Sequence, residues 1–405
     1  MTSFDTSPQP DVRRALLALA VVFVMLATTG WTALRHQRHP VPLQASLNAW
    51  EHGRMAGHRL PDPQSAPARL ARFFASLTEG QRATLVRRYP LAVGNMNGAP
   101  VQLRYRANRI ALGQAREVER ERVRDARLTP SGQRQAALRM DRFEALTRPG
   151  RRILAFDPSG PGRVAEVFGD LRGAERISVV VPGVDTDLLT FQRAHRAHSA
   201  PVGMAKSLYA AERRAAPSIR TAVIAWADYT APSGLGMDAA TAMRAEDGAL
   251  RLDALVRGLP GIAPVSLFCH SYGSVVCGVA AHRLPERVAD IAVAGSPGMR
   301  AEDASRLRTT ARVWAMRDAD DWIQDVPYLE LGGLGHGADP VAAEFGARVL
   351  SAREAKGHAG YFAPGTDSLR NFAGIGVGAY HSVSCAGGDD LCRTGLSGTT
   401  TTGRA

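Results

Sequence analysis

Cysteine and lysine are scarce in this sequence, and their scarcity excludes several classes of protein. Four cysteines among 405 residues are too few for a disulfide-framework fold or a cysteine-rich zinc protein. Only Lys206 and Lys356 are lysines, so arginine supplies almost all of the positive charge. The chain also lacks H-E-x-x-H, Cys/His clusters at zinc spacing, G-x-G-x-x-G and phosphate-binding P-loop patterns. We therefore expect neither a metal nor a cofactor.

The remaining composition is that of an ordinary globular protein. Hydrophobic residues make up 45% and charged residues 22%, which excludes a disordered, collagen-like or polytopic membrane protein. The length fits one large domain with additions, or two domains.

The net charge of +12 is unevenly distributed. Residues 101–152 hold 14 arginines against six acidic residues. Such a segment is typical of a nucleic-acid or anionic membrane surface, but opposite charges three or four residues apart favour a solvated, salt-bridged helix. No RNP, zinc-finger or basic-zipper pattern supports nucleic acid, so we expect no such partner.

Residues 15–34 contain no charge and are long enough to span a bilayer. Their most apolar part, residues 15–27, has the length of a signal-peptide core, but Ala27-Thr28-Thr29 matches a cleavage site poorly. We favour an uncleaved anchor that attaches the protein to the membrane, with the catalytic domain outside the cytoplasm. A cleaved signal peptide on a secreted protein and a buried core helix are the alternatives. Arginines flank the segment on both sides and leave its orientation undetermined.

The pattern divides the chain into six parts. Residues 71–150 are helical, with a capping box from Thr78 to Gln81 and a turn-rich break at 90–100. Cys385 and Cys392 in the tail either form a disulfide or remain thiols. The predicted parts are a tail 1–14, the apolar segment 15–34, a linker 35–70, a helical extension 71–150, an α/β domain 151–380 and a flexible tail 381–405.

Short apolar runs alternate with helical stretches after residue 150. Continuous apolar strands separated by helices indicate a parallel sheet covered on both faces. Ligands of such sheets bind at the carboxyl ends of the strands. The predicted strands lie within residues 177–183, 221–229, 264–271, 289–298 and 311–320.

The sequence VSLFCHSYGSVVCGVA at 265–280 carries the strongest functional signal. An apolar strand ends at His270, Ser271 occupies a sharp turn, and a helix of small residues follows, as in a nucleophile elbow. Gly273 meets the need for a small residue, whereas Cys269 replaces the usual first glycine with another small, buryable side chain. We predict that Ser271 is a nucleophile; the alternative is a serine that caps the helix.

A serine nucleophile needs a base, and the base needs an acid that orients it; in this motif both follow the serine. Asp321 lies just beyond the last predicted strand and is our choice of acid. His358, in a loop bounded by glycines, is our choice of base. Among the other acids of the same segment, Asp318, Asp320 and Asp325, the next choice is Asp320; the alternative is that these are loop aspartates that cap the following helix. Among the histidines, His336 and then His381 are the remaining candidates.

An oxyanion hole requires two backbone N–H groups. One is expected from Tyr272, the residue after the nucleophile. The other is expected from the loop after the first predicted strand, at Gly183 or, as we prefer, Val184. The alternative for this loop is an ordinary Pro-Gly turn that ends a strand.

The ordered motifs LAFDPSGPGRVAEVFGDL, VVVPGVDTDL, AVIAWADYTAP, CHSYGS, AGSPG and GHAGYF resemble the actinobacterial α/β-hydrolase family DUF1023 (Abhydrolase 8). The resemblance covers about residues 73–378. It implies an α/β-hydrolase fold with a helical N-terminal extension, and a catalytic triad of Ser271, His358 and the Asp321 region. It implies no particular substrate.

The expected function is therefore a serine hydrolase that cleaves a carboxylic ester of a small or lipid-like acyl substrate. The same residues would serve a peptidase, an amidase or an acyltransferase. A protein that keeps the fold for binding and has lost turnover is the alternative from another class.

Overall fold

A computed structural model describes residues 42–388 and 390–396. The predicted tail 1–14 and apolar segment 15–34 lie outside these ranges. Within them, no helix combines the length and the hydropathy that crossing a bilayer requires.

An eight-stranded sheet has the order β12-β9-β8-β7-β5-β6-β4-β3. Every neighbouring pair is parallel except those of β4, which is antiparallel to both β3 and β6. Its strands are β3 (Ile153–Asp157), β4 (Arg163–Gly169), β5 (Arg176–Val181), β6 (Thr221–Ala227), β7 (Val265–His270), β8 (Val288–Ala294), β9 (Arg312–Met316) and β12 (Arg348–Val349). The small hairpins are β1 (Arg54–Met55) with β2 (His58–Arg59), and β10 (Glu330–Leu331) with β11 (Leu334–Gly335).

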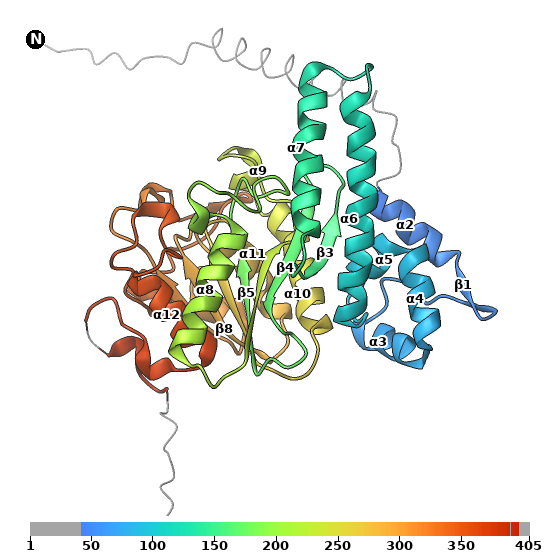
Figure 1. Cartoon of the computed structure of the whole chain (residues 1–405). Helices are drawn as coiled ribbons and strands as arrows, with labels where there is room; N and C mark the ends of the chain where they lie inside the picture. Colours follow the sequence, from blue (N-terminus) through green and yellow to red (C-terminus); the bar gives the residue numbers. More distant parts are fainter. Residues whose placement is uncertain (1–41, 389, 397–405) are drawn as a thin grey trace, which may run out of the picture. The chain divides into compact units, whose positions relative to one another are not determined.

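Helices cover both faces of this sheet (Figure 1). In β5, Val179 belongs to the core under α10 and α11, whereas its neighbour Val180 belongs to the core under α8 and α12. Successive strand residues point to opposite faces, so a sheet buried on both sides needs continuous apolar strands. The α-helices are α2 (Pro42–Glu51), α3 (Pro67–Ser76), α4 (Glu79–Arg88), α5 (Pro90–Asn95), α6 (Val101–Arg124), α7 (Pro130–Thr147), α8 (Pro201–Ala215), α9 (Met237–Ala240), α10 (Met243–Gly258), α11 (Gly273–Ala280) and α12 (Asp367–Val377).

The fold class is the predicted one, a mostly parallel α/β sheet of the α/β-hydrolase type. The five predicted strands are β5 to β9. Strands β3, β4 and β12 were not predicted. β3 and β4 were missed although both are largely buried, and β12 is only two residues long.

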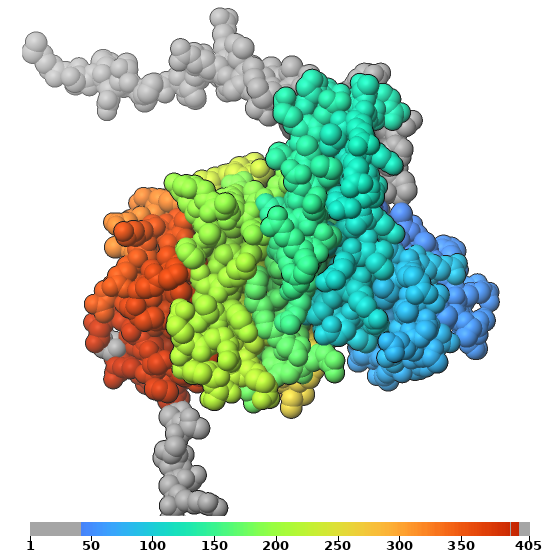
Figure 2. Space-filling view, viewed as in Figure 1, coloured from blue at the N-terminus to red at the C-terminus, as the bar shows by residue number. Residues whose placement is uncertain are grey.

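The helical extension contacts the edge of the sheet through buried amides. Asn95 donates to the Phe156 carbonyl at 2.7 Å and accepts from the Phe156 N–H at 3.0 Å, and Asn108 donates to the Ile153 carbonyl at 3.0 Å. These bonds satisfy backbone groups of β3 that have no further strand beside them. In Figure 2 the blue N-terminal helices lie against the teal α6–α7 pair.

Two local predictions for this extension have different outcomes. The capping box is confirmed: the Thr78 hydroxyl accepts from the Gln81 N–H, and the Gln81 side chain accepts from the Thr78 N–H. The prediction of a turn-rich break at 90–100 is wrong for its first half, because Pro90 begins helix α5. Proline is well suited to the first helical position, where its missing N–H needs no partner.

The predicted salt-bridged helix is present in the second half of α6. Glu117 pairs with Arg120 on the surface, whereas Glu119 accepts from Arg139 of α7 at 2.7 Å in a buried pair. The acidic residues of this segment therefore neutralise part of its arginine content.

The predicted linker 35–70 is corrected by the structure from Pro42 onward. Helix α2 and the β1–β2 hairpin fold back onto the helical extension, and the Trp50 ring is fully buried against Phe74 and Tyr89. The segment is polar overall, so the single tryptophan that anchors it did not stand out in the sequence pattern.

The predicted flexible tail 381–405 is likewise corrected for residues 381–388 and 390–396, which the structure describes. Cys385 and Cys392 form a disulfide, and the backbone of Ser384 hydrogen bonds to Asn371 of α12 at 2.7 Å. Arg348 of β12 donates to the Cys392 carbonyl at 2.8 Å. The alternative of two unpaired thiols is therefore excluded. Residues 397–405 lie outside the described part of the chain.

Candidate active site

Ser271 lies in the sharp turn between β7 and α11. Its φ of +55° is in the left-handed region, which is costly for a residue with a side chain. The Ser271 N–H donates to the Ala294 carbonyl of β8 at 3.0 Å, and Ser274 N–H donates to the Ser271 carbonyl at 2.9 Å. The neighbouring strand and the new helix therefore hold the turn in this conformation.

Two glycines provide the space that this turn needs. A Cβ on Gly273 would lie 2.3 Å from the Val181 carbonyl oxygen, because the helix begins against the end of β5. A Cβ on Gly183 would lie 2.6 Å from the Ser271 Cβ. Any larger side chain at either position would displace the serine or the strand beside it.

Cys269 differs from the expectation of a small free thiol. It forms a disulfide with Cys277, and both residues are buried in the core between the sheet and α11. The bond joins the end of β7 to the helix that follows the serine. Eight residues separate the two cysteines in sequence, and only the sharp turn brings them together.

His358 lies in the short 3-10 helix Gly357–Ala359 and bridges Ser271 and Asp321. Its Nδ1 is 2.9 Å and 3.1 Å from the two Asp321 oxygens, so Nδ1 carries the proton that the carboxylate accepts. Its Nε2 is then left as the acceptor for the Ser271 hydroxyl, 2.8 Å away. Three residues chosen from the sequence are thus joined in one hydrogen-bonded series.

Asp321 is fully buried and begins the 3-10 helix Trp322–Asp325. Besides His358, it accepts from the Ile323 N–H at 2.9 Å and from the Tyr361 hydroxyl at 2.5 Å. Burial by itself raises the pKa of this carboxyl, but the hydrogen bonds from His358 and Tyr361 outweigh it and hold the pKa below its ordinary value. Asp321 is therefore ionised at neutral pH.

The other acidic and histidine candidates have different partners. Asp318 accepts from the Gly357 N–H at 2.8 Å and so holds the start of the His358 loop, whereas Asp320 is exposed. His336 is buried and its Nε2 donates to the Ala239 carbonyl at 2.7 Å. His381 is exposed. None of these four bonds to Ser271.

Three further residues position the series and were not assigned roles from the sequence. The Tyr361 hydroxyl donates to Asp321 and accepts from the Asp318 N–H at 3.0 Å. His270 Nε2 donates to the His358 carbonyl at 2.6 Å. A Cβ on Gly295 would lie 2.8 Å from an Asp321 oxygen and 3.1 Å from His358 Nδ1. All three lie in the motifs HSYG, AGSPG and GHAGYF, and these motifs are the sequence feature from which their roles could have been predicted.

His270 makes folding sensitive to acid. Burial and the neighbouring His358 lower the pKa of His270 to about 3, from an ordinary value of 6.5. The unfolded chain therefore binds a proton that the folded chain does not as pH falls below 6.5, and stability is lost from there toward pH 3. His270→Gln removes this titrating group. We therefore expect the free energy of unfolding of the variant to decrease less steeply as pH falls over this range, by up to about 1.4 kcal/mol per pH unit. Urea unfolding from pH 7 to pH 4 measures the slope.

The exposed His381 provides the matched control for that experiment. His381→Gln should leave the slope of unfolding free energy against pH unchanged. An unchanged slope in His270→Gln would contradict the buried, neutral state of His270.

Tyr272 and Val184 both line a cavity that also contains Ser271. Within the described residues, neither of their backbone N–H groups donates to another group. The Tyr272 side chain is held away by a 2.8 Å hydrogen bond from its hydroxyl to the Thr241 carbonyl. Tyr229 donates to the Pro182 carbonyl at 2.6 Å and supports the Val184 loop. Two donors are therefore available beside the serine.

The cavity beside Ser271 measures about 260 Å³. Its wall is mainly apolar and comes from the α9 region and the segment that follows Asp321. The apolar lining residues are Val184, Leu235, Ala239, Ala240, Pro297, Trp322, Ile323, Val326 and Pro327.

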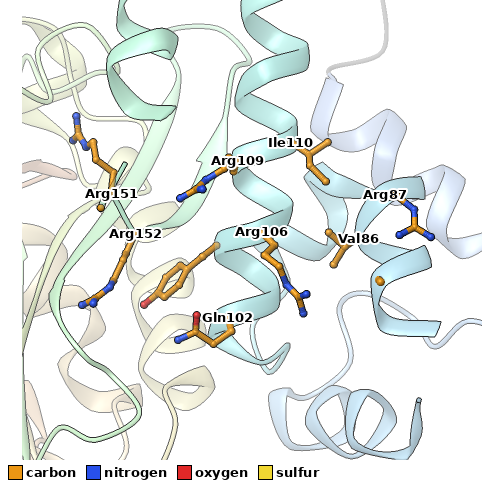
Figure 3. A pocket seen from close by; sticks show the side chains of 11 residues that line it. Val86, Arg87, Gln102, Arg106, Arg109, Ile110, Arg151 and Arg152 are labelled. Carbon is orange, nitrogen blue, oxygen red and sulfur yellow. The ribbon is translucent and has the colours of Figure 1, made fainter. Parts of the chain in front are cut away.

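A larger groove of about 560 Å³ lies elsewhere, between α4, α6 and residues 150–152 (Figure 3). Arginines dominate its wall, among them Arg106, Arg109 and Arg152. The lining contains no serine, histidine or acidic residue, so it offers no nucleophile with a base. The cavity at Ser271 is the candidate active site although it is the smaller of the two.

Comparison with known proteins agrees with this geometry. Residues 157–331 match the model of Abhydrolase_8, described as an alpha/beta hydrolase. The match covers 175 of the 405 residues. The match includes Ser271 and Asp321, whereas His358 follows it.

Two uncharacterised proteins of Mycobacterium tuberculosis, from strains CDC 1551 and H37Rv, are each 27% identical to this chain over 377 residues. The alignment covers 79% of this chain and 57% of each relative. The chain thus matches less than two thirds of the length of these curated relatives.

Solved structures of other hydrolases have low sequence identity and low structural similarity to this chain. A serine hydrolase without a lid from Xanthomonas campestris is 14% identical, with a TM-score of 0.26, covering 44% of this chain and 74% of that one. A 2,6-dihydroxy-pseudo-oxynicotine hydrolase is 10% identical, with a TM-score of 0.30, covering 64% and 82%.

Proposed function

We propose that this protein is a serine hydrolase that cleaves a carboxylic ester through an acyl-enzyme on Ser271. The observation that carries the proposal is the series Ser271–His358–Asp321, with each hydrogen bond between 2.8 and 3.1 Å. The serine is at a strained turn whose side chain faces a cavity.

The geometry allows both halves of the reaction. Ser271 Oγ attacks the ester carbonyl carbon while His358 Nε2 takes the hydroxyl proton, and the imidazolium is stabilised by Asp321. The carbonyl oxygen becomes an oxyanion, which the N–H groups of Tyr272 and Val184 are placed to receive. His358 then returns the proton to the departing alkoxide, and water releases the acid by the same steps in reverse.

The apolar cavity supports an acyl substrate of low polarity. At about 260 Å³ it is slightly smaller than the ~300–1,000 Å³ usual for ligand pockets. It therefore suits a short or medium acyl group rather than a bulky polar one.

We also propose that the protein works outside the cytoplasm, tethered to the membrane by residues 15–34. The two disulfides, Cys269–Cys277 and Cys385–Cys392, support this location, because disulfides persist in oxidising compartments.

A fluorophosphonate probe tests the function directly. The probe should label the folded full chain, and mass spectrometry should find the adduct on Ser271. The rate of p-nitrophenyl butyrate hydrolysis should fall in proportion to the fraction of protein that is labelled. A folded protein that is neither labelled nor active would instead be a binding protein of this fold.

Asp321→Asn tests the role of the acid. The buried amide has nearly the same shape, so we expect the melting temperature to change little. It no longer stabilises the imidazolium or fixes the proton on Nδ1, so kcat should fall by about 10³- to 10⁴-fold. The measurement is kcat for p-nitrophenyl butyrate together with thermal unfolding.

Asp320→Asn is the matched control because Asp320 is adjacent and exposed. It should keep activity within about twofold, in the range usual for exposed positions. An inactive Asp320→Asn beside an active Asp321→Asn would reverse the assignment.

A further inference from the structure

Exposed apolar side chains are concentrated in two segments of the chain. Twelve large hydrophobic residues of the described part are exposed, and seven of them lie in 235–243 and 322–334. We call these seven the apolar rim. They are Leu235, Met237, Met243, Trp322, Leu329, Leu331 and Leu334, with exposed fractions from 41% to 77%.

The two segments meet beside Ser271. Thr241 forms a β-bridge with Leu334, and the Tyr272 hydroxyl donates to the Thr241 carbonyl. The short helix α9, visible in Figure 1, lies in the first segment. The rim is therefore assembled around one place rather than scattered along the surface.

The rim is also continuous with the cavity. Leu235 and Trp322 line the Ser271 cavity and are at the same time exposed. The Trp322 ring lies 4.7 Å from the His358 ring, measured between centroids. A long alkyl chain that places its ester at Ser271 would therefore leave the cavity across the rim.

The charges within the rim segments are largely neutralised. Asp238 pairs with Arg244 at 2.8 Å, and Glu330 pairs with Arg300 at 2.7 Å. Asp325 is the remaining acidic residue of the two segments. This balance fits a nonionic, apolar partner better than an anionic or cationic one.

We propose that the apolar rim docks on a lipid surface and receives the alkyl chains of a water-insoluble amphiphilic ester. This assignment rests on the proposed esterase function. Contiguous exposed apolar surface marks a contact with a membrane or a protein, and aromatic side chains such as Trp322 favour the membrane–water interface. Continuity with the catalytic cavity favours lipid, because the substrate itself then occupies the rim.

The test compares a soluble ester with an ester held in lipid. Wild-type full chain, the double variant Leu331→Ser/Leu334→Ser and the single variant Met237→Ser are assayed on p-nitrophenyl butyrate in solution. The same proteins are assayed on p-nitrophenyl dodecanoate carried in phosphatidylcholine vesicles. The matched control is Ile262→Ser, because Ile262 is 94% exposed and lies outside the rim.

We expect the ratio of the vesicle rate to the soluble rate to fall about tenfold in the double variant and severalfold in Met237→Ser, with no change in Ile262→Ser. The fall should persist at 0.5 M NaCl, since apolar contacts are not screened by salt as charge contacts are. An unchanged ratio in both rim variants, or an equal fall in Ile262→Ser, would overturn the lipid assignment in favour of a protein partner.

A binding measurement separates this inference from the proposed function. Flotation of the Ser271→Ala chain with phosphatidylcholine vesicles should weaken when the rim substitutions are added, and not when Ile262→Ser is added. Every protein compared carries the same residues 15–34, so flotation is compared at a lipid concentration that leaves part of each protein unbound, where a weaker rim contact still lowers the bound fraction. Loss of flotation with no esterase activity in wild type would refute the esterase and keep the lipid-docking rim. Esterase activity with unaltered flotation would refute the rim alone.

Discussion

Replacing Ser271 with alanine is expected to lower kcat/KM for p-nitrophenyl butyrate by at least about 10³-fold and to abolish fluorophosphonate labelling. In the proposed mechanism the hydroxyl oxygen forms the bond of the acyl-enzyme, and alanine has no atom in its place. The oxyanion donors and the cavity remain, so a small residual rate above background is expected.

Stability should not account for that loss. Alanine accepts the same backbone conformation as serine at φ +55° with a similar strain, and within residues 42–388 and 390–396 the Ser271 hydroxyl is bonded only to His358. Ser274→Ala is the matched control, because the hydroxyl of this buried serine of the same elbow donates to the Cys269 carbonyl and not to the His358 ring. Ser274→Ala should remain labelled and active. A Ser271→Ala protein with more than a tenth of wild-type activity would exclude Ser271 as the nucleophile.

Replacing His358 with alanine is the second substitution with a very large expected effect, again about 10³-fold or more in kcat/KM. Among the residues that the structure describes, the imidazole is the only group within hydrogen-bonding distance of both the Ser271 hydroxyl and the Asp321 carboxylate. Without it the serine keeps its proton, and Asp321 retains its bonds to Tyr361 and Ile323. Single-turnover acylation measured by the burst of p-nitrophenol should disappear.

His336→Ala is the informative comparison for that variant. His336 lines the same cavity but donates to the Ala239 carbonyl, so its loss should change KM more than acylation. If His336→Ala lost the burst and His358→Ala kept it, the base would be His336 and the present assignment would be wrong.

In the proposed esterase, the cavity and the rim bind different parts of the substrate. The cavity of about 260 Å³ receives the acyl group next to Ser271, and the exposed side chains around it contact the remainder of the substrate. The arginine-lined groove of Figure 3 takes no part in this chemistry.

Local patterns were sufficient for the central sheet and the elbow. Residues 265–280 encode a strand, a sharp turn and a helix within one short segment, and the turn needs a small residue at Gly273. The five central strands are continuous apolar runs, because both of their faces are covered. Both properties depend on residues that are neighbours in sequence, which a single sequence displays.

The tertiary structure decided what depends on distant residues. Asp318, Asp320 and Asp321 look alike in sequence, and only the approach of His358 and Tyr361 distinguishes Asp321. The burial of Trp50 and the meeting of the two rim segments likewise depend on contacts between residues far apart in sequence. The sequence by itself therefore determined the kind of sheet and the predicted nucleophile. The partners of that serine and the surface around it were decided by packing, because their contacts join residues up to 97 positions apart, whose approach no local pattern records.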